Sequence, residues 1–61
     1  MKQEPKAYTF SNRMPANIWE IVRTLQTASK RKKMLEILFP DSKFEVQKYQ
    51  RNFYVTGKLS G

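Results

Sequence analysis

Residues 15–39 have the sequence PANIWEIVRTLQTASKRKKMLEILF, and the periodicity of their apolar side chains carries most of the information about the fold. On a helical wheel of about 100° per residue, five apolar residues of the first half fall in one arc: Ile18, Ile21, Val22, Leu25 and Ala28. Polar side chains occupy most of the remaining wheel, which predicts an amphipathic helix over residues 15–28. Pro15 suits the first position of this helix, where its missing N–H is not needed.

The same wheel fails beyond Ser29. If one straight helix continued, Lys32 and Glu36 would enter the apolar arc. Three apolar residues would then leave that arc: Met34, Ile37 and Leu38. A new wheel that starts one residue later removes the conflict, so the sequence predicts a turn near residues 28–30 and a second helix over residues 30–39, capped by the Ser29 side chain. The alternative is one long helix in which Lys32 reaches past the apolar surface to water.

Segments on either side of these helices favour β-structure. Tyr8, Thr9 and Phe10 favour a short strand over residues 7–10, and Pro40 ends the second helix. Alternating apolar and polar side chains in the last third of the chain predict a β-hairpin.

The hairpin register follows from its loop. A two-residue loop at Arg51-Asn52 predicts three cross-strand pairs: Phe44–Leu59 on a mainly apolar face, and Tyr49–Tyr54 and Glu45–Lys58 on the other face. A longer loop in the same place would keep a similar register, and it is an alternative because arginine disfavours the positive φ of tight hairpin loops.

These elements define one α+β domain over residues 1–61: a short N-terminal strand, two helices and a C-terminal β-hairpin (β-α-α-β-β), preceded by a mobile tail at residues 1–6. A chain of 61 residues buries only about 60% of its unfolded surface and is marginally stable alone. Dimerisation or a tightly built core would supply the missing burial.

The composition argues against catalysis, metal binding and membrane insertion. The chain has no histidine, no cysteine and one aspartate, so no convincing nucleophile–base pair or ordinary zinc site can be assembled. The two glycines exclude a glycine-rich phosphate loop. No apolar run approaches the roughly 20 residues of a membrane span, and the N-terminal residues do not resemble a secretory signal. We therefore expect a cytoplasmic protein without catalytic residues, a metal site or a cofactor.

The charge points to a polyanionic partner, because Lys and Arg number 12, Asp and Glu number 5, and the net charge is +7. Four cations stand together at the start of the second predicted helix: Lys30, Arg31, Lys32 and Lys33. Cations in that place oppose the helix dipole. They become favourable where an anion binds, since free N–H groups and cations then converge on a phosphate. A solvated run of charges without a ligand is the alternative.

The hairpin carries a second candidate surface, on the face expected to lie outside: Tyr49, Arg51, Tyr54 and Lys58. Exposed aromatic rings among cations can stack on unpaired bases. Tyrosines in such positions also cover a helix or a partner chain, which is the simpler alternative.

The segment FSNRMP at residues 10–15, the apolar positions after it and the basic segment before Glu36 resemble the ribbon-helix-helix repressors of the Arc type, over residues 8–38. In that family a strand leads through an Arg-x-Pro step into two helices, and two chains place their paired strands in the major groove of DNA. The resemblance implies a homodimer that reads bases and holds phosphate through two groups of residues: Thr9, Ser11 and Arg13, and Lys30 to Lys33.

The C-terminal hairpin is not part of that family pattern, so a free-standing domain in which residues 8–10 join the hairpin as a third strand is an alternative that can be monomeric. On balance the sequence predicts a small, basic, non-catalytic DNA-binding protein with a regulatory or accessory role. Two alternatives stay open: a small inhibitor that docks on an acidic protein surface, and a protein that binds RNA or single strands through the hairpin tyrosines.

Overall fold

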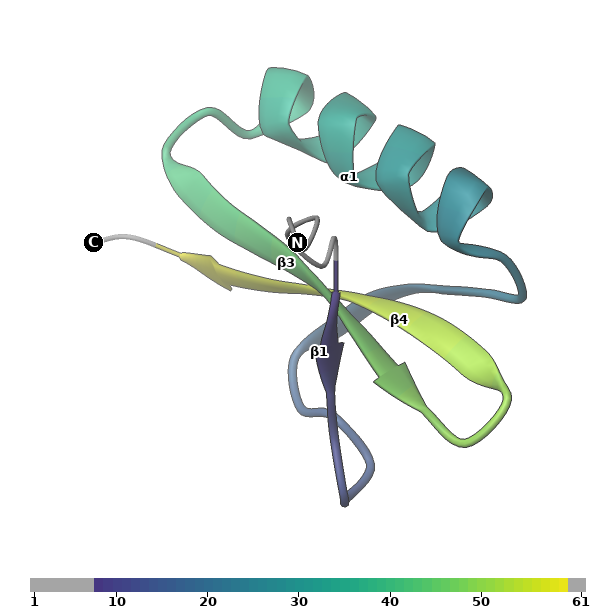
Figure 1. The fold of residues 1–61 in the computed structure, drawn as a ribbon. Helices are drawn as coiled ribbons and strands as arrows, with labels where there is room; N and C mark the ends of the chain where they lie inside the picture. Colours follow the sequence, from purple (N-terminus) through teal and green to yellow (C-terminus); the bar gives the residue numbers. More distant parts are fainter. Residues whose placement is uncertain (1–7, 60–61) are drawn as a thin grey trace, which may run out of the picture.

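The computed structural model describes residues 8–59, in which one helix covers one face of a four-stranded sheet (Figure 1). The elements in chain order are β1 (Thr9–Phe10), β2 (Ile18–Val22), α1 (Leu25–Leu38), β3 (Ser42–Tyr49) and β4 (Asn52–Leu59). Across the sheet the order is β1-β3-β4-β2, with β1 parallel to β3 and the other neighbours antiparallel. The α+β class is confirmed, and the tail predicted at residues 1–6 lies outside the described residues.

The prediction of two helices is wrong. The segment Ile18–Val22, assigned to the first helix, is strand β2, in keeping with the strand preference of its β-branched and aromatic side chains. Helix α1 runs without a break through Ser29, the residue expected to cap a second helix. Its N-cap is Thr24, which has an extended backbone (φ −125°, ψ 152°) and a side-chain oxygen that accepts the N–H of Thr27 at 3.2 Å.

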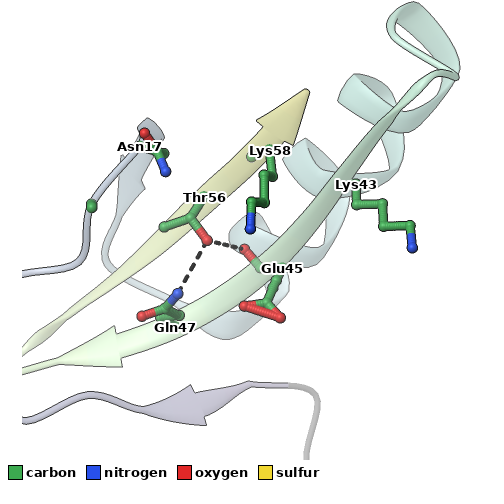
Figure 2. A pocket seen from close by; sticks show the side chains of 8 residues that line it. Asn17, Lys43, Glu45, Gln47, Thr56 and Lys58 are labelled. Carbon is green, nitrogen blue, oxygen red and sulfur yellow. Dashed lines mark hydrogen bonds between the residues drawn. The ribbon is translucent and has the colours of Figure 1, made fainter. Parts of the chain in front are cut away.

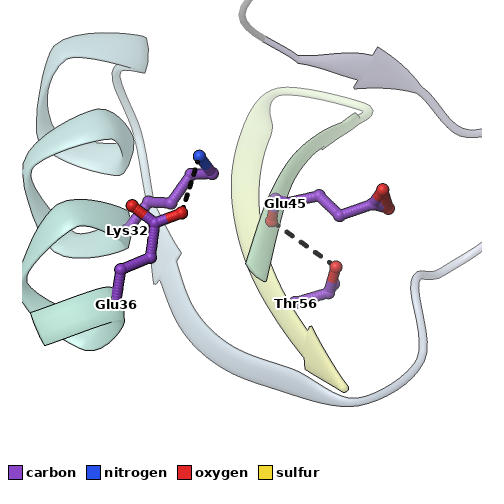
Figure 3. Close-up of polar contacts among 4 residues, drawn as sticks. All are labelled: Lys32, Glu36, Glu45 and Thr56. Carbon is purple, nitrogen blue, oxygen red and sulfur yellow. Dashed lines mark hydrogen bonds and ion pairs between the residues drawn. The ribbon is translucent and has the colours of Figure 1, made fainter. Parts of the chain in front are cut away.

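One continuous helix produces the burial conflict seen on the helical wheel. Ala28 is fully buried against the sheet, and Lys32 shares this side of the helix, half-buried and paired with Glu36 at 3.1 Å (Figure 3). The ammonium of Lys32 therefore stays hydrated while its stem covers apolar surface, as in the alternative of an uninterrupted helix. Three apolar side chains of the helix are consequently left in water: Met34, Ile37 and Leu38.

The core lies between α1 and the central strands. Phe44, Val46 and Val55 alternate along β3 and β4 toward the helix, where they meet Ala28. Trp19 closes one side of this core from β2, with its ring edge-on to Phe44 at a centroid distance of 5.0 Å. The helix contacts three strands, so the core holds together elements that are distant in sequence.

A glycine is required where Phe44 and Trp19 meet. Gly57 lies opposite Phe44 in the sheet, and a Cβ built there would stand 2.5 Å from ring atoms of both aromatic side chains. We expect Gly57→Ala to lower the free energy of unfolding by about 1–3 kcal/mol, because the rings of Phe44 and Trp19 must move to make room. Urea unfolding measures the change, and Lys58→Ala at the next, exposed position is the control, expected within about 0.5 kcal/mol of the parent. Equal stability of the Gly57→Ala variant and the parent would contradict this packing.

The hairpin is confirmed, but its register is displaced by two residues from the predicted one. Its loop is Gln50-Arg51, between paired Tyr49 and Asn52, and Gln50 adopts the positive φ of 58°. All three predicted pairs are therefore wrong, since the actual pairs are Phe44–Gly57, Glu45–Thr56 and Tyr49–Asn52. A shift by two keeps every side chain on its predicted face. The tyrosine rings at positions 49 and 54 consequently remain neighbours along a diagonal, with centroids 6.2 Å apart.

The N-terminal strand joins the hairpin, as in the alternative of a free-standing domain. Thr9 pairs with Gln47 and Phe10 with Lys48, and β2 adds a fourth strand at the opposite edge. The connection over residues 11–17 therefore passes from one edge of the sheet to the other. The order of one strand followed by two helices, which the ribbon-helix-helix resemblance implies, is not the order found here.

Candidate nucleic-acid interface

The acidic side chains are distributed unevenly over the fold. The four in the described part of the chain are Glu20, Glu36, Asp41 and Glu45. Residues 21–35 and 46–59 contain none, and these two segments meet where β2 ends, α1 begins and the hairpin turns. This part of the molecule, comprising Arg23, the first turn of α1 and the hairpin loop, is called the tip end below. It carries cations without neighbouring carboxylates in its own segments.

An open pocket of about 840 Å³ lies at the tip end, lined by Arg23, Gln50, Arg51 and Asn52. Strand pairing creates it, because Val22 lies opposite Phe53 and the next residue, Arg23, is thereby brought to the hairpin loop. Both arginines are exposed. Their planar guanidinium groups can each grip a phosphate through two hydrogen bonds, so the pocket has the chemistry of an anion site.

The basic segment of the helix lies in its second and third turns, and its predicted place at a helix N-terminus is wrong. The helix begins at Leu25, so no free N–H groups converge with these cations. Three of the four side chains are exposed, namely Lys30, Arg31 and Lys33. The fourth, Lys32, is half-buried and forms an ion pair with Glu36. Any phosphate contact made here would come from side chains alone.

The residues predicted to read bases lie elsewhere. Thr9 is exposed on β1. Ser11 comes directly after the end of β1 and donates its backbone N–H to the Lys48 carbonyl oxygen at 2.9 Å. The Ser11 hydroxyl also accepts the Arg13 N–H at 3.3 Å, which forms a local turn and leaves Arg13 exposed. Within the described residues, α1 contacts every strand except β1. The structure therefore does not bring this group together with the helical cations.

The sheet face opposite the helix contains a shallow pocket of about 390 Å³ (Figure 2). Gln47 donates to the Thr56 hydroxyl at 3.2 Å, and that hydroxyl donates to the Glu45 carbonyl at 3.5 Å (Figures 2 and 3). Lys43 and Lys58 lie directly opposite each other in the same pocket. Because the Glu45 carboxylate shares this pocket, its charge is mixed and it is a weaker anion site than the tip end.

The hairpin tyrosines offer little surface for stacking. Tyr54 is only 5% exposed, so its ring is not available to a base, and Tyr49 is half-buried with its hydroxyl accepting from Gln50 at 3.3 Å. A more exposed aromatic side chain, Phe10, stands on β1 beside Tyr8, at a centroid distance of 5.3 Å. The two cations of the predicted second surface lie apart from each other. Arg51 is at the tip end, and Lys58 is on the sheet face opposite the helix.

Arg23 is the cation that sequence reasoning missed. On the predicted first helix it was one of several solvent-facing polar residues. Its place beside Arg51 depends on the pairing of β2 with β4. The signal available was the run of β-branched and aromatic residues in Ile18–Val22, which would have placed Arg23 at a strand end.

Searches of protein families, curated proteins and solved structures found no match to this chain. Among residues 8–59, no group of three or more acidic, histidine or cysteine side chains is placed to hold a metal ion. In the same part of the chain, the helix is too short and too polar to cross a bilayer. The candidate interface therefore rests on the placement of cations in this structure.

Proposed function

We propose that this protein binds nucleic acid, with duplex DNA as the main target, through phosphate contacts from the tip end. The observation that carries the proposal is the open pocket that Arg23 and Arg51 line together, where two segments without Asp or Glu, residues 21–35 and 46–59, come together. The net charge of +7 supports it, because a basic surface of this kind attracts a polyanion. The role is non-catalytic and regulatory or accessory.

The helical cations extend this surface along α1. Arg31 lies six residues beyond the first residue of the helix, which is roughly 9 Å along its axis. A set of cations spread over this length can meet several phosphates of one strand, which follow one another about every 3.4 Å along the duplex axis. Phosphate contacts position a protein without reading sequence. We therefore propose binding with low sequence preference, and a base contact from Arg13 stays a prediction.

The salt dependence of binding tests this function. The parent protein is titrated with random duplex, single strand and heparin at several salt concentrations. We expect the logarithm of the duplex association constant to fall linearly with the logarithm of salt concentration, by about 0.9 per phosphate contacted. Duplex binding that is absent at low salt, or that is insensitive to salt, would exclude the proposal. Tighter binding to single strands than to duplex would assign the surface to RNA or single-stranded DNA.

A further inference from the structure

The pocket at the tip end holds two kinds of polar side chain. Two of its four lining residues carry guanidinium groups, Arg23 and Arg51, and the other two carry amides, Gln50 and Asn52. A guanidinium only donates hydrogen bonds, whereas a side-chain amide donates through its NH2 group and accepts through its oxygen. The oxygens of a phosphodiester accept hydrogen bonds from such donors. A phosphate held by the arginines would therefore leave the amide oxygens without a donor.

Both amides are open to a ligand. Within residues 8–59, the amide of Asn52 makes no hydrogen bond, and its atoms reach solvent. Gln50 is exposed and donates one amide N–H to the Tyr49 hydroxyl at 3.3 Å, which leaves its oxygen and its second N–H unused among the same residues. Each amide can therefore offer one N–H and one oxygen to the same partner group.

The turn that carries these amides is narrow and projects from the sheet. Lys48 and Phe53 are the last hairpin residues that pair with the outer strands β1 and β2, so residues 49–52 extend beyond them. Figure 1 shows this turn and the loop between β2 and α1 at the same side of the molecule. The Lys48 ammonium donates to the Gln50 carbonyl at 3.0 Å, a contact that ties the turn to the strand before it. The major groove of duplex DNA, about 12 Å wide, admits a two-stranded β-ribbon and can take this turn.

We propose that residues 49–52 enter the major groove and that the amides of Gln50 and Asn52 read adenine there. The inference rests on the proposed function, because Arg23 and Arg51 keep their phosphate contacts. Adenine presents an acceptor, N7, beside a donor, the N6 amino group, and one amide satisfies both at once. Reading one or two base pairs is a small sequence preference, which adds to the phosphate contacts without replacing any of them.

The accepting half of the amide decides against the other bases and the other groove. Guanine presents two acceptors in the major groove, N7 and O6, so an amide oxygen there would face a second oxygen. Cytosine presents only a donor, its N4 amino group, so the amide N–H would stay unused. In the minor groove an A·T pair shows only acceptors, adenine N3 and thymine O2, and the amide oxygens would again have no donor. Adenine in the major groove is the edge that uses both halves of the amide.

Duplexes that differ only in their base edges test this reading by fluorescence anisotropy at one salt concentration. The probes share length and backbone and contain A·T pairs, G·C pairs, inosine–cytosine pairs, or A·T pairs with 7-deazaadenine. Inosine–cytosine keeps the major-groove groups of G·C but lacks the guanine N2 amino group of the minor groove, and 7-deazaadenine lacks only N7. We expect the A·T duplex to bind about fivefold or more tighter than the other three, which is the lower end of the discrimination that one amide–adenine pair supplies.

Removal of the two amides separates base reading from phosphate binding. Gln50→Gly suits the positive φ of this position, and together with Asn52→Ala it should abolish the preference for A·T while the log–log salt slope stays that of the parent. Gln26→Ala is the matched control, because it removes an exposed amide at the start of α1 that does not line the pocket, and it should keep both quantities. Circular dichroism checks that all variants keep the parent fold.

The remaining outcomes contradict the inference in different ways. Equal affinity of the parent for the four duplexes, or a preference that survives loss of both amides, overturns the inference and leaves the proposed function in place. Inosine–cytosine that binds as tightly as A·T would move the reading to the minor groove, and a preference for G·C would give it to an arginine, so both results overturn it. A chain that binds none of the duplexes at low salt contradicts the proposed function as well.

Discussion

Phe44→Ala is expected to leave the protein largely unfolded at room temperature. The Phe44 side chain is buried at the centre of the core, in contact with the Trp19 ring and opposite Gly57. Removing a buried phenyl group costs about 3–5 kcal/mol, because the surrounding apolar side chains are left without a packing partner and the cavity collapses only in part. A domain of this length has a total stability of roughly 3–9 kcal/mol, so one such substitution removes much of it.

Circular dichroism and urea unfolding measure this effect. Phe10→Ala is the matched control, because it removes the same side chain from β1, where 61% of it is already in water. Its expected cost is about 1 kcal/mol, the size of its ring contact with Tyr8. Similar unfolding midpoints for the two variants would contradict a core centred on Phe44.

Neutralising both arginines of the tip end, with Arg23→Gln and Arg51→Gln together, is expected to weaken duplex binding about a hundredfold or more at low salt. Each guanidinium that grips a phosphate contributes a charge-assisted hydrogen bond of about 1.5–3 kcal/mol. The slope of the log–log salt plot should also flatten by about 1.8, because each of the two phosphates that is no longer gripped accounts for about 0.9. Fluorescence anisotropy at three or more salt concentrations gives both quantities.

The double variant Lys43→Gln/Lys58→Gln is the control for this experiment. It removes the same formal charge, but from the sheet face that lies opposite the helix. Those two lysines share a pocket with Glu45, and their replacement should change affinity and slope much less. Equal effects of the two double variants would show that binding responds to net charge alone. A larger effect of the lysine variant would move the interface to the sheet face.

The faces of the hairpin could be predicted from sequence, but the partners of its residues could not. Side chains alternate with a period of two, so any register that differs by an even number keeps Phe44 and Val46 on the buried face. The choice between such registers depends on the loop, where Gln50 takes the positive φ. It also depends on Gly57, whose missing side chain makes room for Phe44 and Trp19.

The helix over residues 30–38 could also be predicted, but its start could not. Ile18, Ile21 and Val22 fit an apolar arc of a helix and also favour a strand, so the local pattern is compatible with both. Pairing with β4 decides in favour of the strand, because the free edge of β4 gains a hydrogen-bonded neighbour there. Burial of Lys32 counted against one continuous helix in the sequence, but in the structure this side chain is only half-buried and its ammonium pairs with Glu36.

The α+β class, the excess of cations and the lack of histidine and cysteine can be read from the sequence, because they follow from local preference and composition. The positions of those cations depend on contacts between distant segments. Arg23 reaches Arg51 through the pairing of β2 with β4. Met34 and Ile37 are turned outward because one continuous helix can offer only one side to the sheet. The physical reason is that a free strand edge and an uncovered sheet face must both find partners, and the elements that satisfy them are distant in sequence.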